Sequence, residues 1–336
     1  MKPKSHYDIV IVGSGLGGLV SAIIMAKEGY SVCVLEKNQQ FGGNLQTFSR
    51  NKSIFDTGVH YIGSLSKGEN LYQYFNYLGI MDGLSLKKMD EDGFDVISFD
   101  DDENDYKYAQ GFDKFIAQLT TYFPEEEKAI NTYCQQIKAT CDTFPLYRLK
   151  SGSPYADDVF LLQVKSYLES ITKNKRLQAV LAGSNFLYAG DGYKTPFYVH
   201  SLSVNSYIES AYRCINGGSQ ITKLLVKQLK NYGGDIFKHH DVENLVCENG
   251  LIKAAICTNG NQIEGTTFIS NIEPKITLNI VGKEHFRKSY TKRIENIEST
   301  IAAFSLYIVL KPDSFKYINN NYYHFKTQDA VWNAQN

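Results

Sequence analysis

The stretch that decides the fold is YDIVIVGSGLGGLVSAIIMAKEGYSVCVLEKNQQFGGN, which runs from Tyr7 to Asn44. Residues 7–12 are rich in valine and isoleucine, a pattern typical of a central parallel strand that is buried on both faces. Glycines in G-x-G-x-x-G register follow, and residues 19–28 then predict a helix that ends at Gly29. Residues 31–36 predict a second strand. The order of strand, glycine turn, helix and strand predicts the start of a Rossmann-like α/β fold.

The three glycines of this register predict a dinucleotide site. Gly13 permits a tight turn, Gly15 lets the backbone approach a pyrophosphate, and Gly18 brings the helix close to the strand. Glu36 ends the second strand, where a carboxylate binds a ribose 2′-hydroxyl and repels a 2′-phosphate, which argues against NADP. A purely structural turn would not need this acid. A membrane anchor is also disfavoured, because four glycines and a serine interrupt the apolar span 8–26 and no cleavage site follows.

The residues after Glu36 resemble those of a known family of flavoproteins. Lys37 follows the acid directly, and the adjacent pair Gly42 and Gly43 comes a few residues later, followed by Asn44. This order is similar to that of the FAD-dependent phytoene desaturase, carotenoid isomerase and retinol saturase (all-trans-retinol 13,14-reductase) family, within the flavin amine-oxidase superfamily. There the Gly-Gly pair lies along the flavin diphosphate and is usually followed by arginine, whereas this chain has asparagine. The resemblance implies FAD as the cofactor.

Later phrases extend the resemblance over most of the chain. FDTGVHYIG, residues 55–63, follows a predicted hairpin and resembles the segment that passes near the flavin ring in this family. The resemblance therefore implies that His60 and Tyr61 lie nearest the ring. His60 could donate a proton in catalysis or serve only to hold the backbone at the strand exit. At the DV phrase, it implies that the backbone of Val242 meets the adenine.

The pattern of elements predicts two domains from a discontinuous chain. We expect residues 1–65 and 210–300 to form a glutathione-reductase-type FAD/NAD(P)-binding domain, and residues 66–209 and 301–336 to form an inserted α+β substrate domain. AAFSLYIVL, residues 302–310, is expected to be a buried strand of the substrate domain. Members of the resembled family continue to a glycine-rich segment that closes over the flavin, so we expect this chain to lack the C-terminal part.

Composition excludes several classes of partner. The formal net charge is −1, so no strong field attracts nucleic acid. The six cysteines are scattered without metal-ligand spacing, and no metal site is expected. Forty-three per cent hydrophobic and 21% charged residues are typical of a globular protein, expected in the cytoplasm and able to contact a membrane peripherally. The oligomeric state is open.

The resemblance implies an enzyme that acts on carbon–carbon double bonds. We expect an FAD-dependent oxidoreductase that saturates, desaturates or isomerises a retinoid- or carotenoid-like polyene, with a lipophilic small molecule as substrate. The sequence does not choose among these three reactions. A flavin amine oxidase, which shares the nucleotide motifs, and a non-catalytic flavin- or lipid-binding remnant are the two alternatives.

Overall fold

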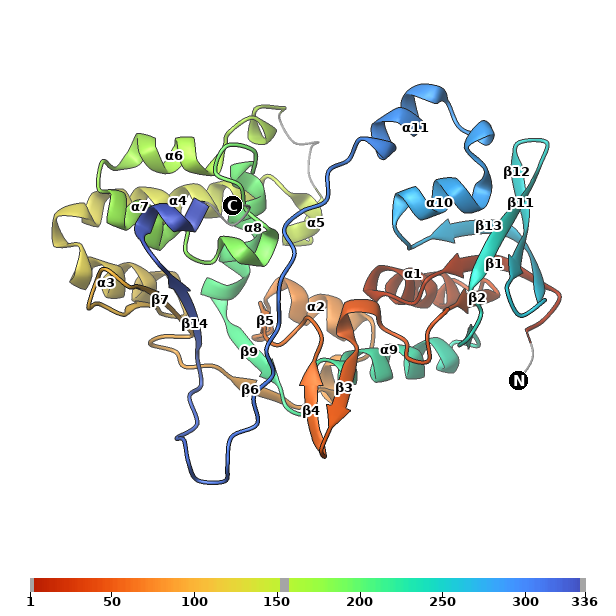
Figure 1. Cartoon of the computed structure of the whole chain (residues 1–336), viewed down its shortest axis with the longest axis horizontal. Coiled ribbons are helices and arrows are strands. Elements are labelled where there is room, and N and C mark those ends of the chain that lie inside the picture. The colour runs from red at the N-terminus through yellow and green to blue at the C-terminus, as the bar shows by residue number, and fades with distance from the viewer. Residues whose placement is uncertain (1–2, 152–156, 333–336) are drawn as a thin grey trace. The chain divides into compact units, whose positions relative to one another are not determined.

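A computed structural model describes residues 3–151 and 157–332 (Figure 1). The chain divides into two compact units. The first unit contains the described residues of Met1–His60, Tyr74–Ser85 and Cys214–Ser299, and the second contains those of Tyr61–Gln73, Leu86–Arg213 and Thr300–Asn336. Each unit therefore combines segments that are distant in sequence.

The division differs from the expected domain boundaries by up to five residues at each boundary, since residues 61–65 and 210–213 and Thr300 belong to the second unit. It also differs at a separate segment, Tyr74–Ser85, which belongs to the first unit. Two contacts hold it there. The Lys27 ammonium donates to the Tyr77 carbonyl at 2.9 Å and lies 3.6 Å from the centre of the Tyr77 ring. The Gln228 amide donates to the Gly79 carbonyl at 2.7 Å. Sequence patterns do not reveal such contacts, because the partners lie about 50 and 150 residues away.

A six-stranded sheet forms the centre of the first unit, in the order β10-β2-β1-β13-β12-β11. Strands β10, β2, β1 and β13 are parallel, while β13, β12 and β11 form an antiparallel meander. The expected buried strand is β1, in which Val10 and Ile11 are fully buried although they face opposite sides. The bounds are β1 His6–Val12, β2 Val32–Leu35, β10 Asp235–Phe237, β11 Val242–Glu248, β12 Leu251–Cys257 and β13 Gln262–Ser270.

Helices and a hairpin complete this unit. Helix α1 packs on β1 and β2 and against α9, whereas α10 packs on β11 (Figure 1). The predicted hairpin is confirmed, since β3 pairs with β4 across a turn in which Asn51 and Lys52 both have positive φ. The bounds are α1 Leu16–Lys27, α9 Ser219–Asn231, α10 Pro274–Val281, α11 Lys288–Glu295, β3 Thr47–Arg50, β4 Ser53–Asp56, and the 3₁₀ turns Gly43–Leu45, Met81–Gly83 and Lys283–His285. Helix α2, Asn70–Tyr77, begins in the second unit and ends in the first.

The second unit is mainly helical, with two three-stranded sheets in the orders β14-β7-β8 and β5-β9-β6. Its helices are α3 Phe112–Tyr122, α4 Glu127–Asp142, α5 Pro145–Arg148, α6 Val164–Ile171, α7 Lys175–Leu181 and α8 Phe197–Glu209. Its strands are β5 Ile62–Gly63, β6 Leu86–Lys88, β7 Asp95–Phe99, β8 Tyr106–Tyr108, β9 Ala211–Cys214 and β14 Asn321–Phe325. The 3₁₀ turns are Pro124–Glu126, Asp157–Phe160, Asn185–Tyr188 and Gln328–Trp332.

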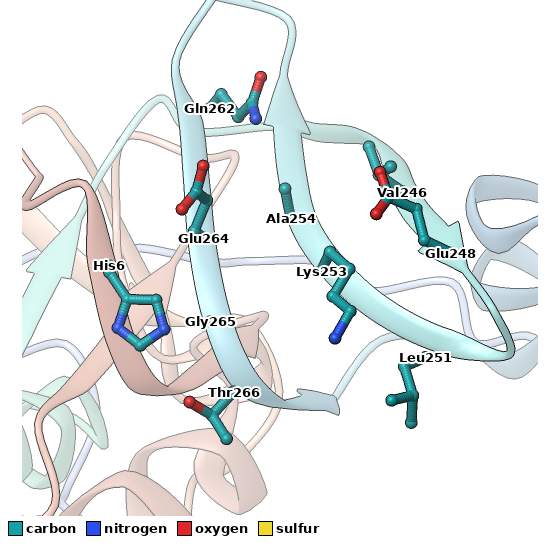
Figure 2. Close-up of a pocket in the computed structure, with 10 residues that line it drawn as sticks. All are labelled: His6, Val246, Glu248, Leu251, Lys253, Ala254, Gln262, Glu264, Gly265 and Thr266. Carbon is teal, nitrogen blue, oxygen red and sulfur yellow. The ribbon is translucent and has the colours of Figure 1, made fainter.

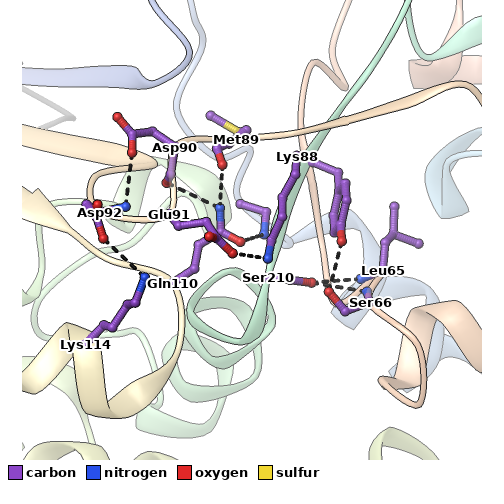
Figure 3. Close-up of polar contacts among 12 residues, drawn as sticks. Leu65, Ser66, Lys88, Met89, Asp90, Glu91, Asp92, Gln110, Lys114 and Ser210 are labelled. Atoms are coloured by element: carbon purple, nitrogen blue, oxygen red, sulfur yellow. Dashed lines mark hydrogen bonds and ion pairs between the residues drawn. The ribbon is translucent and has the colours of Figure 1, made fainter.

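Two buried polar side chains, Gln110 and Ser210, connect the segments of this unit (Figure 3). The Gln110 amide donates to the Met89 carbonyl at 3.0 Å, and its oxygen accepts from the Ala211 N–H at 3.0 Å. The Ser210 hydroxyl oxygen accepts from the N–H groups of Leu65 and Ser66 at 3.2 and 3.3 Å. Backbone groups of three separate segments are thereby satisfied away from water, which keeps their burial from destabilising the fold.

The expected buried strand at residues 302–310 is wrong. These residues have no regular secondary structure, and Phe304, Leu306 and Ile308 are 93%, 72% and 66% exposed. Their apolar composition is that of a strand, but a strand forms only where another strand completes its hydrogen bonds and a face is covered. No described strand pairs with them.

Candidate dinucleotide-binding site

The glycine loop joins β1 to α1 and has the geometry that the register predicts. Gly13 has φ +96°, which favours glycine, and its N–H donates to the Leu35 carbonyl at 2.9 Å. A Cβ on Gly18 would overlap the Gly13 carbonyl oxygen, so the helix approaches the strand as closely as its third glycine allows. Gly15 precedes α1 with no side chain to cap it, so the first turn offers its N–H groups outward.

Glu36 follows β2 and is only 6% exposed. Its Oε2 accepts from the Ser14 N–H at 3.1 Å and from the Ser14 hydroxyl at 2.5 Å, and its Oε1 accepts from the Asn38 N–H at 2.8 Å. These three hydrogen bonds compensate for the free-energy cost of removing the carboxylate from water. A carboxylate has about four acceptor sites, so room for a ligand hydroxyl remains.

Ser14 also connects the glycine loop to the second glycine pair. The Gly42 N–H donates both to the Ser14 hydroxyl oxygen, at 3.2 Å, and to the Ser14 carbonyl oxygen, at 3.1 Å. Gly42 has φ +109°, and a Cβ there would overlap the Thr222 hydroxyl. A Cβ on Gly43 would lie 3.2 Å from the Gly15 Cα. The two glycine motifs, separated in sequence, are therefore in direct contact.

A cavity of about 270 Å³ lies along this loop. Six of the predicted cofactor residues line it: Gly13, Gly15, Glu36, Lys37, Gly43 and Val242. The other lining residues are Val12, Ser14, Leu35, Asn38, His240, Asp241, Asn271, Ile272, Glu273 and Ile276. The volume lies just below the range of about 300–1,000 Å³ usual for ligand pockets, which suits one nucleotide half of a dinucleotide.

Three predicted cofactor residues, Gly18, Gly42 and Asn44, do not line the cavity. Gly18 and Gly42 instead pack closely against the Gly13 carbonyl oxygen and the Thr222 side chain, where a Cβ atom would overlap. Asn44 is exposed in the 3₁₀ turn after Gly43, where its carbonyl oxygen accepts from the Val59 N–H at 3.4 Å. Whether these residues contact the cofactor stays a prediction.

Ser14 and Asn271 belong to the site but were not among the residues predicted from the sequence. Ser14 occupies a variable position of the glycine register, so the motif gave no reason to select it. Asn271 follows β13, and its N–H donates to the Val12 carbonyl at 2.8 Å. The signal was available in principle, because ligands bind at the carboxyl ends of parallel strands, but the pairing of β13 with β1 had to be known first.

The two candidate catalytic residues do not line this cavity. His60 is exposed, and its Nδ1 lies 3.4 Å from the Gly58 carbonyl oxygen, at the long end for a hydrogen bond. Tyr61 is 3% exposed and belongs to the core of the second unit, where its ring lies 4.4 Å from that of Tyr207. Their catalytic roles stay predictions.

Tyr61 is part of a buried hydrogen-bond network. Its hydroxyl donates to Asp95 Oδ2 at 3.1 Å and lies 2.6 Å from the Tyr323 hydroxyl, while the Asn321 amide donates to Asp95 Oδ1 at 2.8 Å. Burial raises the pKa of Asp95 to about 7 and raises the pKa of Tyr61 well above its usual value. Tyr61 is therefore a neutral donor that holds Asp95 in place.

A second cavity of the first unit, of about 540 Å³, lies on the meander and is open (Figure 2). His6, Lys253 and Glu264 contribute polar groups, and Ala254 contributes a methyl group. None of the predicted cofactor residues lines it. The glycine-loop cavity is therefore the better candidate, because it combines a phosphate-type loop with a buried acid.

No helix in the described parts of the chain has the length and apolar character needed to span a bilayer.

Comparison with known proteins agrees with this geometry. Residues 11–78 match the family of NAD(P)-binding Rossmann-like domains. All-trans-retinol 13,14-reductase of Rattus norvegicus is 27% identical over 96% of this chain and 57% of its own length. Prolycopene isomerase 2 of an Oncidium hybrid is 25% identical over 94% and 57%, and 4,4′-diapophytoene desaturase of a Methylomonas species is 22% identical over 90% and 61%. The chain thus spans little more than half the length of these relatives.

Solved structures share the fold at lower identity. An oxidoreductase from Methanosarcina mazei superposes with a TM-score of 0.62 at 17% identity, over 86% of this chain and 65% of that one. Cyclohexylamine oxidase from Brevibacterium oxydans gives a TM-score of 0.57 at 16% identity, over 86% and 63%. Together with the relatives, these similarities confirm the expected α/β fold with a Rossmann-like domain. Along most of its length the chain is similar to retinol 13,14-reductases, phytoene-type desaturases and prolycopene isomerases.

Proposed function

We propose that this chain is an FAD-dependent oxidoreductase that acts on a C=C bond of a retinoid- or carotenoid-like polyene. The observation that carries the proposal is the network joining Ser14, Glu36 and Gly42 around the glycine-loop cavity. It brings an anion-binding loop, a buried ribose acceptor and a second glycine pair into one site. The relatives that match most of the chain supply the substrate class.

The residues present fit a bound FAD. The helix start after Gly15 would take the pyrophosphate, and Glu36 would accept the ribose hydroxyl. The backbone of Val242, which lines the same cavity, would meet the adenine. We further propose that the first unit holds the cofactor and that the second unit supplies the substrate side.

When bound, flavin supplies the hydride chemistry of such reactions. The chain's own residues must then bind the cofactor, exclude water and move a proton. In a saturation, one carbon receives the hydride and the other a proton, and His60 is our candidate donor because the usual pKa of histidine lies near neutrality. Relatives of this chain include a reductase, a desaturase and an isomerase, so an activity assay must choose among saturation, desaturation and isomerisation.

Cofactor binding is tested first, by the absorbance spectrum and flavin stoichiometry of the purified protein. Gly15→Ala should lower the affinity for FAD at least tenfold, because the added methyl group would project into the space where the pyrophosphate is proposed to bind. In the protein itself the new Cβ would meet only Asn271 Nδ2, at 3.1 Å. Gly93→Ala in the second unit is the matched control and should retain FAD. Undiminished binding by Gly15→Ala would contradict the site.

The reaction is tested with photoreduced protein under anaerobic conditions. Reoxidation by a polyene such as retinol or a carotene precursor would support the proposal. Reoxidation only by imines would assign the chain to the amine oxidases, while flavin binding without any turnover would favour the non-catalytic remnant. His60→Ala should slow a polyene reaction by about 10²–10⁴-fold if His60 is the acid. An unchanged rate would leave it a structural residue.

A further inference from the structure

Asn271 is one of the residues lining the cavity to which the family resemblance assigns no role. It stands at the carboxyl end of β13, the parallel neighbour of β1, with its backbone fixed by the bond to Val12. The side chain reaches back over the glycine loop. Its Nδ2 lies 3.1 Å and 3.0 Å from the positions that Cβ atoms on Gly15 and Gly18 would occupy, and its Oδ1 lies 2.7 Å from that position on Gly17.

These distances give the glycine loop a second reason to lack side chains. Gly15, Gly17 and Gly18 all face the Asn271 amide, and a methyl group on any of them would crowd it. Asn271 also lines the cavity. Within the part of the chain that the structure describes, no hydrogen bond involves its side-chain amide, so its donor is available to a ligand.

The charges around the cavity make a neutral donor useful here. Glu36, Asp241 and Glu273 contribute carboxylates to the lining. Among the residues that line the cavity, Lys37 is the one lysine or arginine. A pyrophosphate on this loop must therefore be held mainly by N–H groups. An amide aimed at the loop provides such a group without adding charge.

We propose that the Asn271 amide donates directly to the pyrophosphate of the bound dinucleotide and positions it on the glycine loop. This inference rests on the proposed function. It adds a donor from β13 to those of the β1–α1 loop, so that two neighbouring parallel strands hold the same phosphate group.

The test uses Asn271→Asp, which keeps the size and shape of the side chain but replaces the donor with a negative charge. Calorimetric titration with ADP, which carries the pyrophosphate, is compared with titration with adenosine, which does not. The aspartate variant should bind ADP about 10–100-fold more weakly, the range for losing a hydrogen bond to a charged group. The loss should shrink as salt is added, because part of it is charge repulsion. Adenosine affinity should be unchanged.

Asn249→Asp is the matched control, since Asn249 lies in the exposed turn between β11 and β12 of the same unit, and it should bind both ligands like the wild type. Equal ADP affinity of Asn271→Asp and wild type would overturn the inference and leave the proposed function standing. An equal loss of ADP and adenosine would also overturn it, because the residue would then be structural. A wild-type protein that binds neither ligand would overturn both proposals.

Discussion

At the scale of single residues, the glycines of the loop are required for different physical reasons. Gly13 is needed for its positive φ, Gly18 for its contact with the Gly13 carbonyl, and Gly17 for its contact with Asn271. The sequence register could identify Gly13, Gly15 and Gly18, because their spacing is a local pattern. Asn271 could not be identified in the same way, since its contact arises only when β13 pairs with β1.

Gly18→Ala and Gly29→Ala distinguish a steric contact from a positive φ as the reason why a position needs glycine. Gly18→Ala should destabilise the fold by about 1–3 kcal/mol, because the methyl group overlaps the Gly13 carbonyl and the loop must shift. It should also weaken FAD binding. Gly29 has φ +89° with nothing within 4 Å of its Cβ position, so Gly29→Ala should cost about 1 kcal/mol of stability and leave binding intact. Urea unfolding and flavin titration measure the two effects. Normal binding by Gly18→Ala would contradict this account of the loop.

At the scale of elements, hydrophobic period and turn chemistry located β1, α1, β2 and the β3–β4 hairpin correctly. Local patterns do not encode which strands become neighbours, so the placement of β13 beside β1 and of β14 beside β7 came only from the structure. Helix α9 shows the same limit. The residue that caps its first turn, Asp56, lies 162 residues from Gly218.

Asp56 should stabilise α9 from outside the helix. Its Oδ1 accepts from the Gly218 N–H at 2.7 Å, and its negative charge lies at the positive end of the helix dipole. Asp56→Ala should lower the free energy of unfolding by about 1 kcal/mol, as the loss of an N-cap usually does. Asp56→Asn keeps an acceptor oxygen and should recover part of this loss. Equal stability of the alanine variant and the wild type in urea would show that the contact does not cap the helix.

At the scale of the whole molecule, the discontinuous two-part organisation was expected because α/β signals occur at both ends of the sequence. The second unit could be predicted only in outline, since its buried polar network joins residues from distant segments. Asp95 on β7 is held by Tyr61 and by Asn321 on β14. Such a network has no sequence signature, although it affects how the stability of the molecule depends on pH.

Stability should fall as the pH rises toward neutrality because of Asp95. Burial raises the pKa of Asp95 to about 7 in the folded chain, whereas an unfolded aspartate has a pKa near about 3.9. The folded state therefore holds the proton more tightly. Its stabilising effect is complete below about pH 4 and is lost as the pH rises through about 7, at up to about 1.4 kcal/mol per pH unit.

Asp95→Asn removes this titration. The free energy of unfolding of the variant, measured in urea from pH 5 to pH 8, should vary less with pH than that of the wild type. Asp105→Asn, at an exposed position of the same unit, is the control and should leave the wild-type slope unchanged. Parallel profiles for Asp95→Asn and the wild type would show that Asp95 is ionised throughout this range.

The exposed apolar segment 302–310 predicts the behaviour of this chain in solution. Phe304, Leu306 and Ile308 are mostly exposed within a few residues of one another, and contiguous apolar surface of this kind drives association. We expect the 336-residue chain to self-associate as its concentration rises, which sedimentation velocity can measure. Phe304→Lys combined with Ile308→Lys should shift the distribution toward monomer, because burying two ammonium groups opposes association.

Leu251→Lys is the control, because Leu251 is 60% exposed at the start of β12, and it should have no such effect. A wild-type chain that stays monomeric at all concentrations would show that this segment is covered in solution.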